Sequence, residues 1–149
     1  MGLENEILQS KFRNNFQKAA VNIIYTYHWL NEQMKIVFSK QDITSQQFNI
    51  LRILRGANKP LSTLQIRQRM LDKMSDTSRI VDRMVIKGLV MKNISPADKR
   101  MVDITISNKG QQVLQEIDKY ESQMDDIMKN MTENEAETLN LLLDKLRNA

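Results

Sequence analysis

The stretch SDTSRIVDR, residues 75–83, carries two arginines at a spacing that could bind a polyanion. If the stretch is helical, at about 100° per residue, Arg79 and Arg83 share one face with Ser75 and Ile86. The opposite face is mostly apolar and consists of Thr77, Ile80, Val81, Met84 and Val85. A guanidinium group can bind a phosphate or a guanine edge through two parallel hydrogen bonds. A solvated amphipathic helix at the surface would show the same pattern.

A second cationic group follows in the segment SPADKR, which ends with Lys99 and Arg100. Its flanks, GLVMKNI and MVDITI, resemble short strands, so the segment is predicted to form the tip of a β-hairpin. A long cation at such a tip can reach a phosphate or a narrow groove. Pro96 restricts the loop and Asp98 can hold an arginine in place, which lowers the entropy cost of binding. The alternative is an ordinary polar turn.

Composition excludes several kinds of chemistry. The 149 residues include no cysteine, which removes disulfides, thiolate metal sites, cysteine nucleophiles and thiol redox sensing. The single histidine, His28, argues against an ordinary zinc site. We find no glycine loop that would cradle phosphate and no nucleophile–base pair, so we expect no enzyme, no metal and no cofactor. No apolar run approaches the ~20 residues of a membrane span and no signal peptide is visible, so we expect a cytoplasmic protein without a membrane partner.

Charge is unevenly distributed along the chain. The formal net charge is +4, but residues 62–102 carry nine Lys or Arg against four Asp or Glu. Residues 103–149 carry five basic side chains against ten acidic ones. A basic middle segment would suit a polyanionic partner, whereas a solvated surface of mixed charge is the other reading.

Capping signals and glycines divide the chain into helices. Three capping boxes are predicted, in which a hydroxyl and a Glu or Gln three residues later satisfy free amides: Thr44 with Gln47, Ser62 with Gln65, and Thr132 with Glu135. Ser75 is predicted to cap the arginine-bearing helix, which ends at Gly88. The expected order is a helix over 5–38, helices over 45–56 and 63–70, the arginine-bearing helix, the hairpin, a long helix capped by Ser107, and a last helix.

Two of these helices carry apolar residues at heptad spacing. The first seam is Phe16, Ala20, Ile23, Tyr27, Leu30, Met34 and Val37, and the second is Val113, Ile117, Tyr120, Met124, Ile127 and Met131. The last helix adds Leu139, Leu142, Leu143 and Leu146. Seams of this kind need a partner helix, in the same chain or in a second copy.

The central segment resembles the multiple antibiotic resistance regulator (MarR) family of winged-helix transcription factors. The family's recognition helix typically reads T-R-L-V-D-R-L followed by K-G-L-V, and this chain has SRIVDRM followed by KGLV. The wing signature P-x-D-x-R is matched by Pro96, Asp98 and Arg100, and L-T-x-x-G by Ile106, Ser107 and Gly110. The departures, which include Ser for Thr at two positions, are mild. The resemblance implies a mainly α fold with a small β-hairpin wing, a winged helix-turn-helix with N- and C-terminal dimerisation helices.

The resemblance also implies functional roles. Residues 39–106 would bind DNA, and residues 1–38 and 107–149 of the single 1–149 chain would form a homodimer. The implied contacts to double-stranded, palindromic operator DNA are Ser75, Asp76, Thr77, Ser78, Arg79, Arg83, Lys99 and Arg100, with Pro96 and Asp98 organising the wing. A small aromatic or phenolic ligand could bind near Tyr25, His28 and Trp29, although aromatic residues at helical spacing more often serve in packing or dimer contacts.

Two functions follow from this reading. The first is a homodimeric, sequence-specific DNA-binding regulator, a repressor relieved by a small ligand. The second is a winged-helix module that binds protein and not DNA, as an antirepressor would. The two differ in salt dependence, because phosphate contacts give a steep loss of affinity as salt rises.

Overall fold

The computed structural model describes residues 1–148, and most of its helices begin at a capping side chain. All three predicted capping boxes are formed, at the starts of α3 (Ser45–Ala57), α4 (Thr63–Arg69) and α8 (Glu133–Arg147). The predicted cap of α6 (Asn108–Asp118) is also confirmed, because the Ser107 hydroxyl accepts a hydrogen bond from the Gly110 amide at 3.0 Å.

The start of α5 (Thr77–Ile86) lies one residue later than predicted. Asp76 is the capping residue, and its carboxylate accepts from the Arg79 amide at 3.2 Å. The prediction that Ser75 caps this helix is therefore wrong. The Ser75 hydroxyl instead donates to the Asp72 carbonyl at 2.9 Å, inside the turn that precedes the helix. An aspartate cap also places a negative charge at the positive end of the helix dipole.

The end of α5 is set by Gly88, as predicted. Gly88 has a φ of +74°, which side chains rarely adopt. The Leu89 amide donates to the Met84 carbonyl at 2.9 Å and the Gly88 amide donates to the Val85 carbonyl at 3.0 Å. This pair of bonds is a Schellman motif, which reverses the chain directly into the hairpin.

The wing is a two-stranded antiparallel hairpin of β1 (Val90–Ile94) and β2 (Val102–Ile106). Val90 pairs with Ile106 at the base, and Ile94 pairs with Val102 near the tip. Leu61 adds an isolated bridge to Ile104, with N–H···O distances of 3.1 and 2.8 Å. Gly110 lets α6 approach this base, because a Cβ there would lie 2.3 Å from the Leu89 carbonyl oxygen.

The N-terminal helix is shorter than the predicted span of 5–38. The structure has a single turn, α1 (Leu3–Glu6), and then α2 (Asn15–Ser39). Leu8 has a φ of 54°, which no helix tolerates, and Asn14 is extended. The Asn14 side chain caps α2 by accepting from the Gln17 amide at 2.9 Å. The predicted apolar seam begins only at Phe16, so it gave no evidence for helix before Asn14.

The long helix predicted after Ser107 is also broken. It separates into α6 and α7 (Glu121–Asp126), and Tyr120 between them has φ −103° and ψ 10°. The heptad spacing runs across the break, since Tyr120 and Met124 both pack against the core. The heptad spacing of the apolar residues was therefore correct, but the prediction of one continuous helix was wrong.

The core lies in one lobe, formed by α3, α4, α5, α6 and the hairpin, and the end of α2 adds the buried Val37 and Phe38 to it. Its fully buried side chains include Ile50, Leu51, Leu61, Ile66, Met70, Val81, Met84, Leu89, Ile104, Leu114 and Ile117. Helix α6 belongs to this lobe by packing, although the sequence reading grouped it with the dimerisation helices. The remaining helices, α1, α2, α7 and α8, form what we call the arm, and neither α7 nor α8 contains a buried residue.

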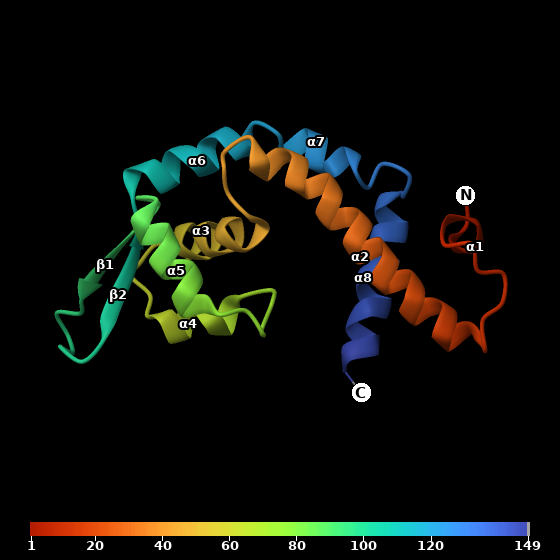
Figure 1. Cartoon of the computed structure of the whole chain (residues 1–149), viewed down its shortest axis with the longest axis horizontal. Coiled ribbons are helices and arrows are strands. Elements are labelled where there is room, and N and C mark those ends of the chain that lie inside the picture. Colours follow the sequence, from red (N-terminus) through yellow and green to blue (C-terminus); the bar gives the residue numbers. More distant parts are fainter. Residues whose placement is uncertain (149) are drawn as a thin grey trace.

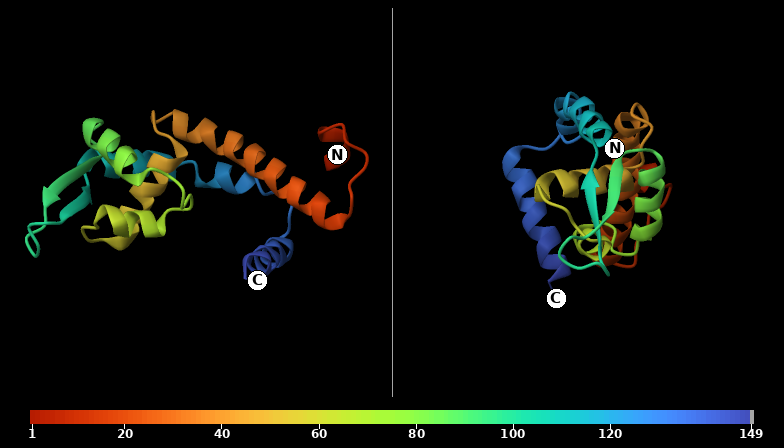
Figure 2. Two further views of the ribbon diagram at one scale, coloured as in Figure 1. Left: turned by 60° about the horizontal axis from the view of Figure 1, so that its bottom comes forward. Right: turned by 90° about the vertical axis from the view of Figure 1, so that its left-hand side faces the viewer.

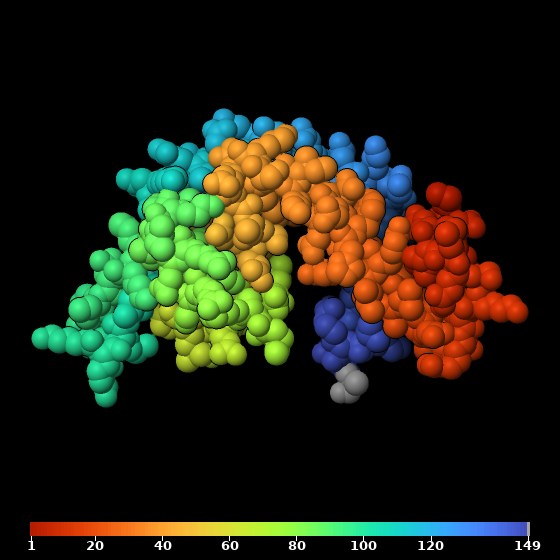
Figure 3. All heavy atoms as spheres, in the orientation of Figure 1, coloured from red at the N-terminus to blue at the C-terminus, as the bar shows by residue number. Residues whose placement is uncertain are grey.

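Lobe and arm together make an arch (Figure 1), with the hairpin extending from one end and α1 at the other. The C-terminal end of α2, α6 and α7 form the top of the arch, and a notch separates lobe from arm beneath it (Figure 3). A rotated view shows α8 standing apart from the lobe (Figure 2). Within residues 1–148, no helix has the length and apolar character needed to cross a bilayer.

Candidate nucleic-acid interface

Helix α5 buries one face and exposes the other. Thr77, Val81 and Met84 are buried in the lobe, as the helical wheel predicted. Arg79 and Arg83 are exposed on the outer face. Asp76 restrains Arg79 only weakly, at 4.0 Å, and the Arg83 side chain has no hydrogen bond or ion pair to any other described residue. The buried face anchors α5 in the lobe, so the two guanidinium groups extend into solvent from a helix that is held in place.

The wheel was wrong about Ser75. Its side chain is 8% exposed and that of Thr77 is 3% exposed, and their hydroxyl oxygens lie 3.5 Å apart. Both residues support the turn into α5 from inside. Asp76 and Ser78 are the members of this group with exposed side chains. The DNA contacts expected of Ser75 and Thr77 stay a prediction. Such contacts by their side chains would require this turn to open.

Two further arginines lie on α4, next to α5. Arg67 and Arg69 are exposed and have no ion-pair partner among the described residues. Arg67 lines an open hollow between α4 and α5 together with Met74, Asp76 and Ser78. The sequence reading counted both arginines in the basic segment but gave them no role. Their positions could have indicated a role, because they follow the buried Ile66 by one and three residues on the first helix of the helix-turn-helix.

The wing tip has the organisation that the sequence predicted for Asp98. Its carboxylate accepts from the Arg100 amide at 3.0 Å and from the Arg100 guanidinium at 3.1 Å through each of two nitrogens. The side-chain hydrogen bond from Arg100 is the main cause that lowers the pKa of Asp98, and the backbone bond adds to it. The Met101 amide closes the turn onto the Asp98 carbonyl at 3.0 Å.

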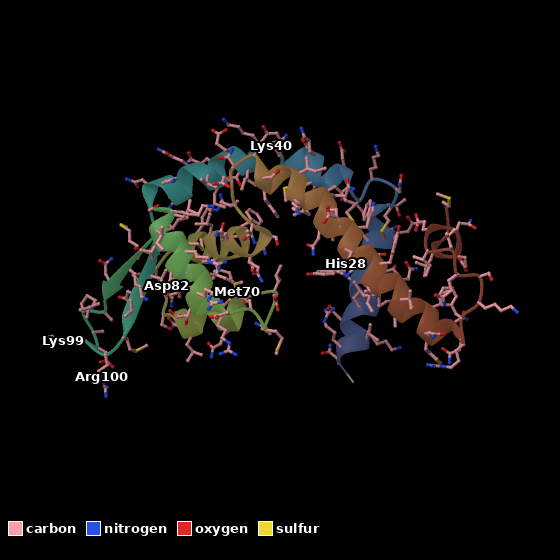
Figure 4. The ribbon with its side chains drawn as sticks, viewed as in Figure 1. His28, Lys40, Met70, Asp82, Lys99 and Arg100 are labelled. Carbon is pink, nitrogen blue, oxygen red and sulfur yellow. The ribbon has the colours of Figure 1, made fainter. Side chains whose placement is uncertain are left out.

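Lys99 and Arg100 are the outermost residues of the hairpin (Figure 4). The Arg100 side chain is 90% exposed even though it is paired with Asp98. The pair therefore aims the guanidinium without burying it. An ion pair so exposed adds little stability, so orientation is its main effect.

An ion pair connects the recognition helix to the wing. The Lys92 ammonium on β1 lies 3.2 Å from the Asp82 carboxylate on α5. Asp82 lies on the side of α5 that faces the hairpin (Figure 4). The contact couples the direction of the wing to that of the helix.

The three residues predicted to bind a ligand, Tyr25, His28 and Trp29, are not gathered into a pocket of the single chain. Tyr25 is half-buried, whereas His28 and Trp29 are exposed, and none of the three lines the two open hollows between α2 and α3. Tyr27, at 5.3 Å from His28 between ring centroids, lines one of these hollows instead. His28 lies on the arm, midway along α2 (Figure 4).

Known proteins share this architecture. The model of the MarR family matches residues 43–102. The multiple antibiotic resistance protein MarR of Escherichia coli K12 is 29% identical over 119 residues, which cover 78% of this chain and 79% of that protein.

Two solved structures have the same fold. A mutant of Escherichia coli MarR, complexed with operator DNA, superposes with a TM-score of 0.81 at 24% identity, over 92% of this chain and 99% of that one. The organohalide-sensing regulator RdhR-CbdbA1625, bound to 2,4-dichlorophenol, has a TM-score of 0.83 at 23% identity, over 94% and 86%. With its mostly helical fold, its two-stranded hairpin and the match over residues 43–102, the chain is similar to the winged-helix transcription regulators of the MarR family.

Proposed function

We propose that the protein is a homodimeric, sequence-specific DNA-binding regulator that represses its targets until a small ligand binds. This proposal rests on the exposed guanidinium groups of two neighbouring elements, helix α5 and the hairpin. Arg79 and Arg83 project from a helix anchored in the core, and Arg100 projects from a hairpin tip held by Asp98. A helix of this kind fits the major groove while the wing contacts the adjacent backbone or minor groove.

Each cation has a distinct task in this proposal. Arg79 and Arg83 read base edges or bind phosphates in the major groove. Lys99 and Arg100 bind the backbone beside it, and Arg67 adds a phosphate contact from α4. Asp76, Ser78 and the α5 N-terminus lie closest to the groove floor, where a carboxylate can accept from a cytosine amino group.

The arm supports a dimer. Leu139, Leu141, Leu142 and Leu146 of α8 are all exposed in one chain, as are Phe16, Ile23, Ile24 and Tyr27 of α2. Apolar stripes of this extent on two helices are normally covered, and a second copy covers both at once in a two-fold dimer. The arm helices α1, α2, α7 and α8 would then join two copies of the lobe, and the two lobes would lie on successive major grooves.

Ligand control extends the proposal. The RdhR-CbdbA1625 regulator was solved with 2,4-dichlorophenol bound. By analogy we propose a small aromatic or phenolic ligand here, between arm and lobe, where Tyr27 lines an open hollow. Tyr25, His28 and Trp29 would take part once a partner chain covers their side of α2. A regulator that acts on operator DNA works in the compartment that holds the DNA, so the cytoplasmic assignment is part of this proposal.

Selection of bound fragments from a random DNA pool, followed by a salt titration on the selected site, tests the proposal. We expect an imperfect palindrome and a linear fall of log affinity with log salt. Arg83→Ala should weaken binding, and if Arg83 contacts only phosphate the salt slope should shrink by about one. Lys129→Ala removes the same charge from the arm and should leave the slope unchanged. Failure to enrich any DNA would favour the protein-binding alternative.

A further inference from the structure

The polypeptide passes between arm and lobe at two places, both at the top of the arch (Figure 1). The first crossing is residues 40–44, between α2 and α3. The second is residues 119–120, between α6 and α7. A notch lies below these crossings (Figure 3). The end of α2 is anchored in the lobe, because the Phe38 ring stacks on Phe48 of α3 with centroids 4.5 Å apart. Polar contacts at the crossings add direction to this apolar anchor.

An ion pair holds the second crossing to the lobe. The Arg55 guanidinium on α3 donates to both oxygens of the Asp118 carboxylate, at 2.8 and 3.2 Å. Asp118 is the last residue of α6, directly before the break. Both side chains are only partly exposed, and the bidentate geometry fixes direction as well as distance.

A cation–π contact joins the two crossings to each other. The Lys40 ammonium lies 4.2 Å from the centre of the Tyr120 ring. Lys40 is the C-cap residue of α2, and Tyr120 carries the non-helical backbone angles that separate α6 from α7. Figure 4 shows Lys40 at the top of the arch, beside this break.

The first crossing is also tied to the recognition helix. Lys87, the C-cap residue of α5, donates to the Asp42 carbonyl, and its ammonium lies 3.7 Å from the Asp42 carboxylate. Three contacts therefore lie along the two crossings, between the end of α5 and the last turn of α6, and the short segments 40–42 and 118–120 link them.

We propose that Arg55, Asp118, Lys40 and Tyr120 are positioning residues that determine which half-site spacing the dimer accepts. This inference rests on the proposed dimeric DNA binding. In a dimer the arms are joined, so the angle between arm and lobe sets the separation of the two recognition helices. One base pair changes that separation by about 3.4 Å and about 35° of rotation. If the lobe is held at one angle, the dimer cannot bind a site with the altered spacing. If the lobe is released, it can move to fit that site.

The test compares affinity for the selected operator with affinity for versions lengthened or shortened by one base pair at the centre. Wild type should discriminate strongly against both. Asp118→Ala should lose roughly 2- to 30-fold in affinity for the natural spacing. It should also show a smaller penalty for altered spacing, which a loss of stability alone would not produce. The exchange Arg55→Asp with Asp118→Arg should restore both values towards wild type.

Glu116→Ala is the matched control, because it removes a carboxylate from the same helix whose partner is Lys119 at 2.8 Å, not a residue of α3. It should keep the wild-type spacing profile. Lys40→Ala, an exposed change at the other crossing, should reproduce the relaxed profile if Asp118→Ala fails to fold. An unchanged profile in folded Asp118→Ala or in Lys40→Ala overturns the inference. Wild type that binds no palindrome overturns the proposed function itself.

Discussion

The lobe and the arm of this protein differ in how they bury their apolar side chains. The lobe closes on itself, and Ile50, Leu51, Ile66 and Leu114 are completely inaccessible to solvent. The arm has comparable aliphatic and aromatic content but leaves it open along α2 and α8. The same amphipathic pattern in the sequence therefore leads to a buried core in the lobe and to an exposed apolar surface on the arm.

The comparison shows that periodicity alone does not tell where a helix finds its partner. In the lobe, α3 contacts α4, α5, α6 and β2, and it also receives the end of α2. In the arm, the described residues of the chain offer α8 no such partner. We infer that the lobe can hold its shape in a single chain, whereas the arm depends on a second one.

Breaking the arm should have the largest effect. Leu142 is 59% exposed in one chain, so Leu142→Glu should spare the fold of the monomer and disrupt the dimer. An unpaired charge buried in an interface costs about 3–5 kcal/mol. Sedimentation equilibrium should then give a mass near the 17.4 kDa of one chain at concentrations where wild type gives twice that mass. The matched control is Leu64→Glu on the lobe, which is 62% exposed and should remain dimeric. Equal dimerisation of the two variants would contradict the proposed interface.

Breaking the lobe should act on stability instead. Leu51 is fully buried, so Leu51→Ala should lower the free energy of unfolding by about 2–5 kcal/mol through lost burial and a cavity. Urea denaturation measures this change. The exposed Leu8→Ala should shift it by less than about 0.5 kcal/mol. A loss below 1 kcal/mol for Leu51→Ala would mean that the lobe core is not as closely packed as described.

Removing the wing cation should be milder and confined to DNA binding. Arg100→Ala should weaken operator binding by about 1–3 kcal/mol, with fold and dimer unchanged. Asp98→Ala should weaken binding too, although it removes a negative charge near DNA, because the turn loses its hydrogen bonds to Arg100. Fluorescence anisotropy on labelled operator measures both. Tighter binding by Asp98→Ala would show that charge, and not wing geometry, controls the site.

The smallest effect should be seen in the titration of Asp98. The hydrogen bond from Arg100 lowers the folded-state pKa of Asp98 below its ordinary value of 3.8. The pair therefore stabilises the wing at pH values above 3.8 and is lost as pH falls through the lowered pKa. Carboxyl NMR should give a midpoint below 3.8 in wild type and a higher midpoint in Arg100→Ala. The same midpoint in both proteins would contradict the pairing in solution.

Much of the lobe could be predicted because its signals are local. Capping boxes such as Thr44 with Gln47 act within one turn, and Gly88 meets a backbone requirement that its neighbours define. The turn geometry of Asp98 and Arg100 is local in the same sense. In each case the interacting groups lie within a few residues of each other, so the sequence contains the whole interaction.

The errors occurred where partners are distant. Tyr120 looks like part of a continuous seam, whereas in the structure it lies at the helix break, where its ring contacts the Lys40 ammonium from eighty residues earlier in the chain. The seam starts at Phe16, two residues after Asn14, and the prediction extended the helix to residue 5 although no glycine or proline and no apolar period marked where it begins. Ser75 was placed outward by the wheel, although its hydroxyl bonds back to Asp72 in a turn that the wheel does not represent.

The central claim is that two chains present two α5 helices to one palindromic DNA site. Hydroxyl-radical footprinting on the selected operator tests it most directly. We predict two protected regions related by a two-fold axis, with centres about 10 base pairs and ~34 Å apart, and loss of both when Arg79 and Arg83 are replaced by alanine together. A single asymmetric protected region the length of one half-site, or an unchanged footprint for the double variant, would contradict the account.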